Sequence, residues 1–257
     1  MSRIYLSKRA KDFIDAADDS GNIRNDRKGL LYVNAIDNAC KVAGITTGAV
    51  YLFAGKDTGD LSISHKFNFL DLIDSDSAFR MTFPNGVTYN NLGVKFSTSQ
   101  YGDTKLVPYT DLEDSNISLS FYRTVASQNS GGDDLRSGFG NNILLRGQRT
   151  TLPGGINTQI NYVGHDNVGF ILSSKTATEF FAICKNIVNT TALSNPQVTR
   201  LLYSFYLGAC NDGQNHTVLN FTGAGYGFCH ISTGMSSQQA IAFSHLITAA
   251  QRAYRGV

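Results

Sequence analysis

The sequence predicts a mainly β protein: an antiparallel β-sandwich with one helix near the N-terminus and a capping helix at the C-terminus. From residue 49 onward, short stretches rich in β-branched and aromatic residues recur about 10–20 residues apart, separated by turn signals. The chain has 257 residues, of which 25 are glycine, 42% are hydrophobic and only 16% are charged. This composition indicates a turn-rich folded protein and argues against disorder.

The chain divides into two parts by composition. Residues 1–28 are polar and charged, and we expect them to form an N-terminal arm or linker. Residues 29–257 show no further boundary and no internal repeat, so we expect a single sandwich domain there.

Two helices are predicted before the first strand. Within the arm, Phe13 supplies an apolar side chain for a short helix over Ser7–Ala17. The segment GLLYVNAIDNACKVA (29–43) predicts a longer helix, because its apolar residues recur at helical spacing. Asp26 is a candidate cap before this helix, and Gly44 fits the position just after its end.

Alternation of apolar and polar residues marks the clearest strand, ISLSFYRT (117–124). Ile117, Leu119 and Phe121 fall on one face, and intervening residues such as Ser120 fall on the other, which predicts a half-buried strand. The other strand candidates are AVYLFAG (49–55), FRMTF (79–83), VKFSTS (94–99), NILLRG (142–147), INTQINYV (156–163), VGFILSS (168–174), TEFFAICKN (178–186), LLYSFYLGAC (201–210) and GYGFCHIS (225–232).

The final predicted element is a well-capped helix. Ser236 and Gln239 have the spacing of a capping box, in which each side chain bonds the other residue's backbone amide. Phe243, Ala250 and Tyr254 then form an apolar stripe. We expect this stripe to be buried against the sandwich or its edge.

No catalytic set is visible in the sequence. A glycosidase needs two carboxylates held about 5–9 Å apart, and Asp74 and Asp76 have suitable spacing, but their surroundings indicate a turn. Nucleophile-elbow, phosphate-loop and dinucleotide motifs are absent, so we predict that the chain is not an enzyme and needs no cofactor. The five histidines and four cysteines lack metal-ligand spacing, so no metal site is predicted.

Charge and hydropathy exclude two further classes of partner. The net charge is +2 and the basic residues are scattered, so we expect no nucleic-acid binding. No run approaches about 20 apolar residues, so we expect no membrane insertion.

Sugar binding is compatible with the composition, because sugar faces stack on aromatic rings while polar side chains bond the hydroxyls. The chain has 12 tyrosines and 16 phenylalanines but no tryptophan. The carbohydrate-binding candidates are Tyr101, Asp103, Tyr109, Asn211 and Asp212. Further tyrosine candidates are Tyr122, Tyr162 and Tyr226. Packing in the core is the alternative for each ring.

Three stretches carry a resemblance to a known family. They are AVYLFAGKDTGDLSISHKFNFLDLIDSDSAFRMTF (49–83), TKLVPYTDLEDSNISLSFYRT (104–124), and LYSFYLGACNDGQN with YGFCHISTGMSSQQAIAFSHLITAAQRAYRGV (202–257). In this order they resemble virion structural proteins of tailed bacteriophages, of the head-fibre, collar or tail-fibre type. The resemblance covers residues 29–257 and implies a laminin-G/concanavalin A-like jelly roll, as in lectins and glucanases. Where the family has Gly-Asp-Gly before the last helix, this chain has Ser232-Thr233-Gly234.

The resemblance implies a structural role on the virion surface, after assembly in the host bacterial cytoplasm. The expected partners are other virion proteins, further copies of the chain, with a trimer favoured, and host-surface glycans. Two alternatives stay open on the same fold: a carbohydrate-binding, lectin-like module and a glycoside hydrolase.

Overall fold

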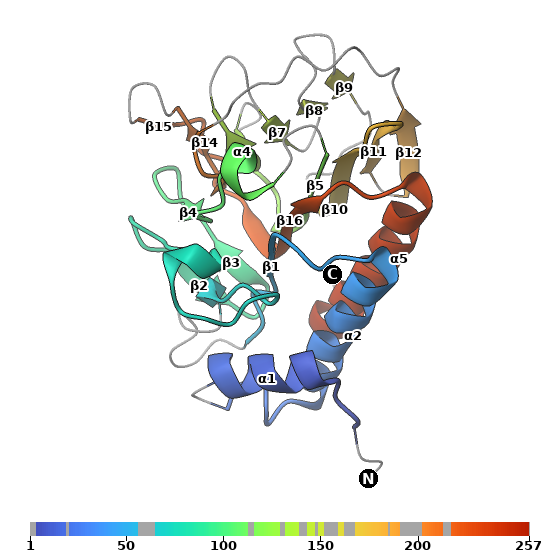
Figure 1. The fold of residues 1–257 in the computed structure, drawn as a ribbon. Helices are drawn as coiled ribbons and strands as arrows, with labels where there is room; N and C mark the ends of the chain where they lie inside the picture. Colours follow the sequence, from blue (N-terminus) through green and yellow to red (C-terminus); the bar gives the residue numbers. More distant parts are fainter. Residues whose placement is uncertain are drawn as a thin grey trace.

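The computed structural model describes residues 4–18, 21–55, 65–112, 116–128, 132–138, 143–146, 149–151, 159–161, 168–184, 186–190, 202–212 and 217–256. Within these residues, two antiparallel sheets pack on each other, and helices cover the outer face of the larger sheet (Figure 1). The predicted fold class, a mainly β jelly-roll sandwich with flanking helices, is confirmed.

The larger sheet of the described chain has eight strands. Their order is β12-β11-β10-β5-β16-β3-β2, and β1 also pairs with β16. The bounds are β1 (Ala49–Tyr51), β2 (Thr88–Asn90), β3 (Gly93–Lys95), β5 (Ile117–Val125), β10 (Gly169–Lys175), β11 (Phe180–Cys184), β12 (Ile187–Thr190) and β16 (Gly225–Thr233).

The smaller sheet has six described strands in the order β4-β13-β6-β7-β8-β9. The bounds are β4 (Gly102–Asp103), β6 (Leu135–Ser137), β7 (Ile143–Leu145), β8 (Arg149–Thr151), β9 (Gln159–Asn161) and β13 (Tyr206–Leu207). A separate ribbon joins β14 (Cys210–Asn211) to β15 (Val218–Leu219).

The centre of the larger sheet is the pair β5 and β16, each nine residues long. Their ladder runs from Gly225 opposite Val125 to Thr233 opposite Ile117, and it is regular from Phe228 onward. Gly48 lets β1 join this pair, because its φ is +98° and a Cβ there would lie 2.2 Å from the carbonyl oxygen of Ile231. Only glycine fits such a close backbone approach.

The described residues include the helices α1 (Lys8–Ala17), α2 (Arg27–Ala43), α4 (Pro108–Asp111) and α5 (Ser237–Arg255), and the 3-10 turn η1 (Asp76–Ala78). The predicted helix at 29–43 is confirmed as α2, with Asp26 as its cap and Gly44 in the left-handed conformation at its end. The predicted capping box at the start of α5 is also present, between Ser236 and Gln239.

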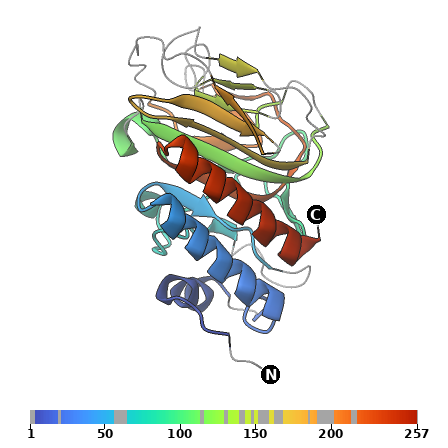
Figure 2. The same cartoon turned by 90° about the vertical axis from the view of Figure 1, so that its right-hand side faces the viewer.

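The two faces of the larger sheet close two separate hydrophobic clusters. Its inner face packs on the smaller sheet, with Phe121 and Tyr226 in the same cluster as Leu135. Its outer face packs on the helices, with Phe228 in the same cluster as Phe243 of α5. Figure 2 shows α5 lying along the sheet, with α2 beside it and α1 beyond α2.

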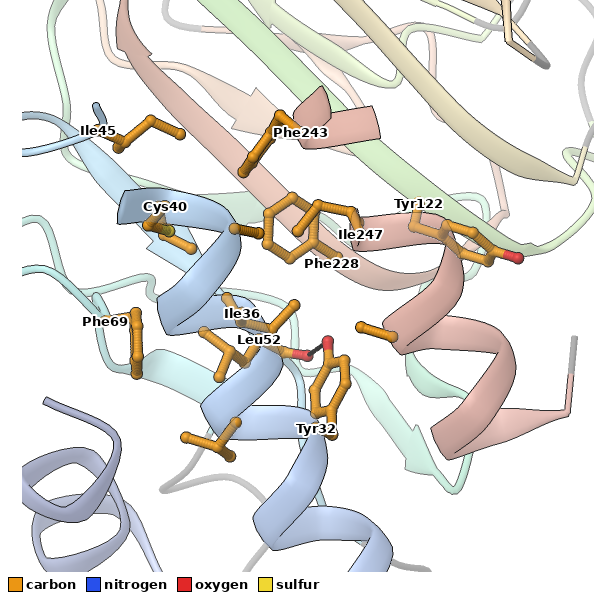
Figure 3. Packing of buried hydrophobic residues seen from close by; sticks show 14 of the residues in the cluster. Tyr32, Ile36, Cys40, Ile45, Leu52, Phe69, Tyr122, Phe228, Phe243 and Ile247 are labelled. Atoms are coloured by element: carbon orange, nitrogen blue, oxygen red, sulfur yellow. Dashed lines mark hydrogen bonds between the residues drawn. The ribbon is translucent and has the colours of Figure 1, made fainter. Parts of the chain in front are cut away.

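Side chains of α2 fill the space between this helix, α5 and the sheet. Ile36 and Cys40 of α2 lie in the same cluster as Ile247 of α5 (Figure 3). The hydroxyl of Tyr32 donates to the carbonyl oxygen of Leu52 at 2.8 Å, which ties α2 to the chain after β1. Helices α1, α2 and α5, called here the helix layer, are therefore part of the hydrophobic core.

For the strand at 117–124, the prediction that its polar face is exposed to solvent is wrong. Ser118 and Ser120 are both 0% exposed, because the helix layer covers this side of β5. The hydroxyl of Ser120 bonds Nδ1 of His230 at 3.0 Å, and the His230 ring lies 5.2 Å from that of Phe243. Polar residues on this face therefore bond one another beneath α5.

Part of the segment 1–28 forms α1, at the position predicted for a short helix. The helix begins after Ser7, whose hydroxyl accepts a bond from the Ala10 amide at 3.1 Å. Phe13 is fully buried, with its ring centroid 5.3 Å from that of Phe69. These contacts place α1 in the same hydrophobic cluster as α2.

Candidate functional site

A group of aromatic and polar side chains gathers at one end of the smaller sheet, where β4 pairs with β13. In this pair Tyr206 lies opposite Asp103. In the extended segment 204–207, which ends in β13, Phe205 and Leu207 are fully buried in the core, whereas Ser204 and Tyr206 are only partly buried. Strand alternation therefore turns Ser204 and Tyr206 to the other face of the sheet.

The aromatic part of this group, called here the tyrosine cluster, consists of Tyr101, Tyr206 and Phe221. The rings of Tyr101 and Tyr206 are stacked, with centroids 4.5 Å apart and planes at 26°. The ring centroids of Phe221 and Tyr101 lie 6.4 Å apart. Tyr101 is buried, with 8% of its surface exposed, whereas Tyr206 and Phe221 are partly exposed. Desolvation, with the nearby Asp103 carboxylate, raises the pKa of Tyr206 well above its usual value, so this phenol stays neutral.

The polar part of the site is centred on Asp103. Its carboxylate accepts bonds from the Ser204 hydroxyl at 2.8 Å and from the Lys105 ammonium at 2.7 Å. Lys105 has a φ of +61°, and this left-handed conformation accompanies a second bond from its own amide to Asp103 at 3.0 Å. Asn211 donates from its side-chain amide to the Ser204 carbonyl at 3.0 Å. Partly exposed rings thus lie beside a carboxylate, an ammonium and a hydroxyl.

The structure brings three of the five sequence candidates together and places two elsewhere. Tyr101, Asp103 and Asn211 belong to the site just described. Tyr109 lies on α4 and is 38% exposed. Asp212 is 4% exposed and accepts a bond from the Thr217 hydroxyl at 2.9 Å, directly after β14 and directly before β15.

The additional tyrosines have different surroundings. Tyr226 is fully buried and donates from its hydroxyl to Asp134 at 2.6 Å. Tyr122 is 3% exposed and packs under the helix layer. Tyr162 lies outside the described residues.

The sequence analysis did not predict four residues of this site: Tyr206, Phe221, Ser204 and Lys105. One signal was available: in YSFYLG (203–208), a strand with Phe and Leu facing inward must turn its Ser and second Tyr to the other side. Lys105 lies two residues after the candidate Asp103, so its position in the sequence was a second available signal. Nothing local marks Phe221, because the fold brings it to the site from a distant segment.

The carboxylates considered for catalysis are engaged in ion pairs. Asp74 pairs with Lys66 at 2.6 Å and with Arg80 at 3.1 Å, and Arg80 also bonds Asp76 at 3.1 Å. Bonds from Lys66 and Arg80 lower the pKa of Asp74 below its ordinary value. This cluster lies on the surface around η1.

A second set of carboxylates, Asp133 and Asp134, is fully buried. Arg123 and Asp134 form an ion pair with side chains 3% and 0% exposed. Asp133 accepts from Arg136 at 2.6 Å and also pairs with Arg146. Since both carboxylates are buried, removal of an arginine partner would leave an uncompensated charge in the interior.

Two other features are absent from the described part of the chain. Its histidine, cysteine and acidic residues form no group of three or more that could hold a metal ion. Its helices include none of the length and hydropathy needed to span a bilayer.

Comparison with known proteins identifies the fold. No protein-family model and no curated protein matches the chain. Domain 4 of AbnA, a GH43 extracellular arabinanase from Geobacillus stearothermophilus solved in complex with arabinotriose, matches with a TM-score of 0.53 and 15% identity, over 78% of this chain and 98% of that one. A mutant of Trypanosoma rangeli sialidase displaying trans-sialidase activity matches with a TM-score of 0.52 and 9% identity, over 88% of this chain. This match spans only 40% of the sialidase chain.

These matches contradict the prediction that the chain is not an enzyme, because both proteins are glycoside hydrolases with a similar fold. The sequence argument failed for a physical reason. It searched for two carboxylates close together on one strand, whereas a sandwich brings side chains from distant strands together. The contact between Asp103 and Ser204, 101 residues apart, is an example.

Proposed function

We propose that this protein binds carbohydrate, with the tyrosine cluster and Asp103 as a sugar subsite. The observation that carries the proposal is the position of two partly exposed rings, Tyr206 and Phe221, in the same site as the polar groups of Asp103, Lys105 and Ser204.

The chemistry of the site suits a sugar ring. The apolar face of a pyranose or furanose packs on an aromatic ring, and its hydroxyls both donate and accept hydrogen bonds. Asp103 offers an acceptor and Lys105 a donor, held 2.7 Å apart. Vicinal hydroxyls of one sugar can bond such a pair, one group to each hydroxyl.

The first structural match supports an oligosaccharide as the ligand class. That arabinanase domain was solved with arabinotriose, and its fold aligns with most of this chain. We therefore place short oligosaccharides first among the ligands to be tested.

The second part of the proposal is the setting: a surface component of a tailed-phage virion, where sugar binding would serve attachment to the host. It rests on the resemblance of residues 49–83, 104–124 and 202–257 to virion proteins. Light scattering coupled to size exclusion tests the oligomer expected of such a component. A trimer of the full chain supports the setting, and a monomer contradicts it.

The experiment for sugar binding is a glycan array that includes arabino-oligosaccharides and bacterial surface glycans, followed by calorimetry on the best ligand. Tyr206→Ala and Phe221→Ala are each expected to weaken binding about tenfold, which corresponds to about 1.4 kcal/mol of lost contact. Tyr5→Ala is the matched control, because Tyr5 is 85% exposed and lies before α1.

Asp103→Asn adds a test of the polar half of the site. It keeps the shape of the side chain but removes the charge that pairs with Lys105. We expect weaker binding at unchanged stoichiometry. Sugar binding that none of these three substitutions alters would place the site elsewhere, and a silent array would remove the proposal.

A further inference from the structure

The charged groups of the candidate sugar subsite lie on the same face of the smaller sheet as its rings. In the β4–β13 pair, Asp103 and Tyr206 are directly opposite each other. Side chains of opposite residues in an antiparallel pair lie on one face, with Cβ atoms about 4.5–5.5 Å apart. Tyr101 precedes Asp103 by two residues and stacks on Tyr206. A sugar that packs on Tyr206 therefore meets the Asp103 carboxylate beside the ring.

The Asp103 carboxylate is paired with the ammonium of Lys105. The two groups are 2.7 Å apart, and their side chains are 12% and 28% exposed. The Lys105 amide also donates to Asp103, from a left-handed backbone with a φ of +61°. Because two bonds from Lys105 end on the same carboxylate, a ligand anion that approaches this ammonium also approaches Asp103.

The hydrogen-bonding capacity of Asp103 suits a hydroxyl ligand. A carboxylate has about four acceptor positions on its two oxygens. From the described part of the chain, Oδ1 accepts from the Ser204 hydroxyl and the Lys105 amide, and Oδ2 accepts from the Lys105 ammonium. A sugar hydroxyl can therefore donate to Oδ2. Desolvation raises the pKa of Tyr206, so its phenol adds no charge. The charges of Asp103 and Lys105 cancel, and the group offers hydrogen bonds without net charge.

We propose that this site selects uncharged oligosaccharides, and that Asp103 is the residue that rejects sugars carrying a carboxylate or a phosphate. The inference rests on the sugar-binding function proposed above. A neutral sugar donates one hydroxyl to Asp103 and accepts from Lys105 with another, while the two side chains stay paired. An anionic group within reach of the Lys105 ammonium lies close to the Asp103 carboxylate, and like charges repel. Specificity of this kind comes from repulsion of the wrong ligand.

The test begins on the glycan array, with the full-length chain and Tyr206→Ala compared. The glycans that Tyr206→Ala no longer binds should be uncharged. Calorimetry then compares three forms of one trisaccharide: arabinotriose, the acid made by oxidising its terminal hydroxymethyl group, and the methyl ester of that acid. If the array selects another neutral glycan, its acid and ester take their place.

We expect the acid to bind about tenfold more weakly than its methyl ester, because the ester keeps the shape of the ligand and removes the charge. The affinity for the neutral forms should be the same at about 0.01 M and about 1 M NaCl, over which the Debye length falls from about 30 Å to about 3 Å.

Asp103→Asn removes the repelling charge at nearly constant size. It should weaken binding of the neutral forms but strengthen binding of the acid, so that the preference for the ester over the acid is lost. Asp15→Asn is the matched control, because it removes an exposed carboxylate on α1 that pairs with Arg24. The preference should persist in this variant. Circular dichroism confirms that each variant is folded.

Two outcomes would overturn this inference and leave the sugar-binding function intact. One is an acid that binds as tightly as its ester, with both lost in Tyr206→Ala. The other is an equal loss of affinity for acid and ester in Asp103→Asn, which would make Asp103 a structural residue only. An array on which Tyr206→Ala changes the binding of no glycan would remove the sugar subsite itself, and this inference with it.

Discussion

The two sheets differ in strand length and in what covers them. The described strands of the larger sheet include two of nine residues, buried on both faces by the smaller sheet and by the helices. Those of the smaller sheet have two or three residues each, and its β4–β13 end carries partly exposed aromatic side chains. The comparison teaches that the larger sheet supplies the stability of the molecule. The smaller sheet presents the candidate site.

The largest effects are therefore expected on the two faces of the larger sheet. Phe121→Ala on the inner face and Phe243→Ala under the helix layer should each lower the free energy of unfolding by about 3–5 kcal/mol, because both rings are fully buried. Urea unfolding measures both. A loss below about 1 kcal/mol for Phe243→Ala alone would show that the helices are not part of the cooperative core.

The next largest loss of stability is expected at the buried ion pair of Arg123 and Asp134. Asp134→Asn leaves Arg123 and the Tyr226 hydroxyl without their carboxylate partner in the interior. We expect a loss of about 3 kcal/mol in the free energy of unfolding. The double variant Arg123→Met, Asp134→Leu should be less destabilised than Asp134→Asn, because it leaves no uncompensated charge. The opposite order would mean that the ion pair itself stabilises the sheets.

The free energy of unfolding should depend on pH, because His230 is buried on the outer face of the larger sheet. Complete burial lowers the pKa of His230 from 6.5 to about 3. The unfolded chain therefore binds a proton below pH 6.5 that the folded chain does not take up until about pH 3. The stability due to neutral His230 is present above pH 6.5 and falls by about 1.4 kcal/mol per pH unit between these values. Unfolding midpoints at pH 7 and pH 5 should differ less in His230→Asn than in the wild type.

The smallest effect on stability should be found at the candidate site. Phe221 is partly exposed, so Phe221→Ala should cost about 1 kcal/mol or less while weakening sugar binding. Thermal unfolding and calorimetry on the same samples separate the two effects. A loss as large as that of Phe121→Ala would make Phe221 a core residue and remove it from the site.

Local signals in the sequence were enough for the helices and for the long strands. The cap and stop residues of α2 and the capping box of α5 are short-range patterns, and the structure reproduces them. The burial of Ser120 was not predictable in this way, because it depends on α5 folding back over the sheet. The segment at 79–83, predicted as a strand, makes only a single bridge, from Thr82 to Asp103.

The candidate site shows the same limit. Tyr101 and Asp103 are neighbours in sequence and could be paired by inspection. Tyr206 reaches them through strand pairing across about a hundred residues, and no local pattern encodes that register. The enzyme prediction failed in the same way, because it judged carboxylates by their spacing in sequence.

The position of β16 in the larger sheet has a consequence for folding during synthesis. This strand pairs with β1, β3 and β5, so three earlier strands depend on one that the ribosome makes after them. Arg255, at the end of α5, adds another contact that forms late in synthesis: its guanidinium donates to the carbonyl oxygen of Phe53 at 2.8 Å. A nascent chain that ends before residue 225 thus exposes unpaired strand edges and the apolar faces of α1 and α2. Such a chain is prone to aggregate until the last strand is made, and contacts between distant segments limit the folding rate.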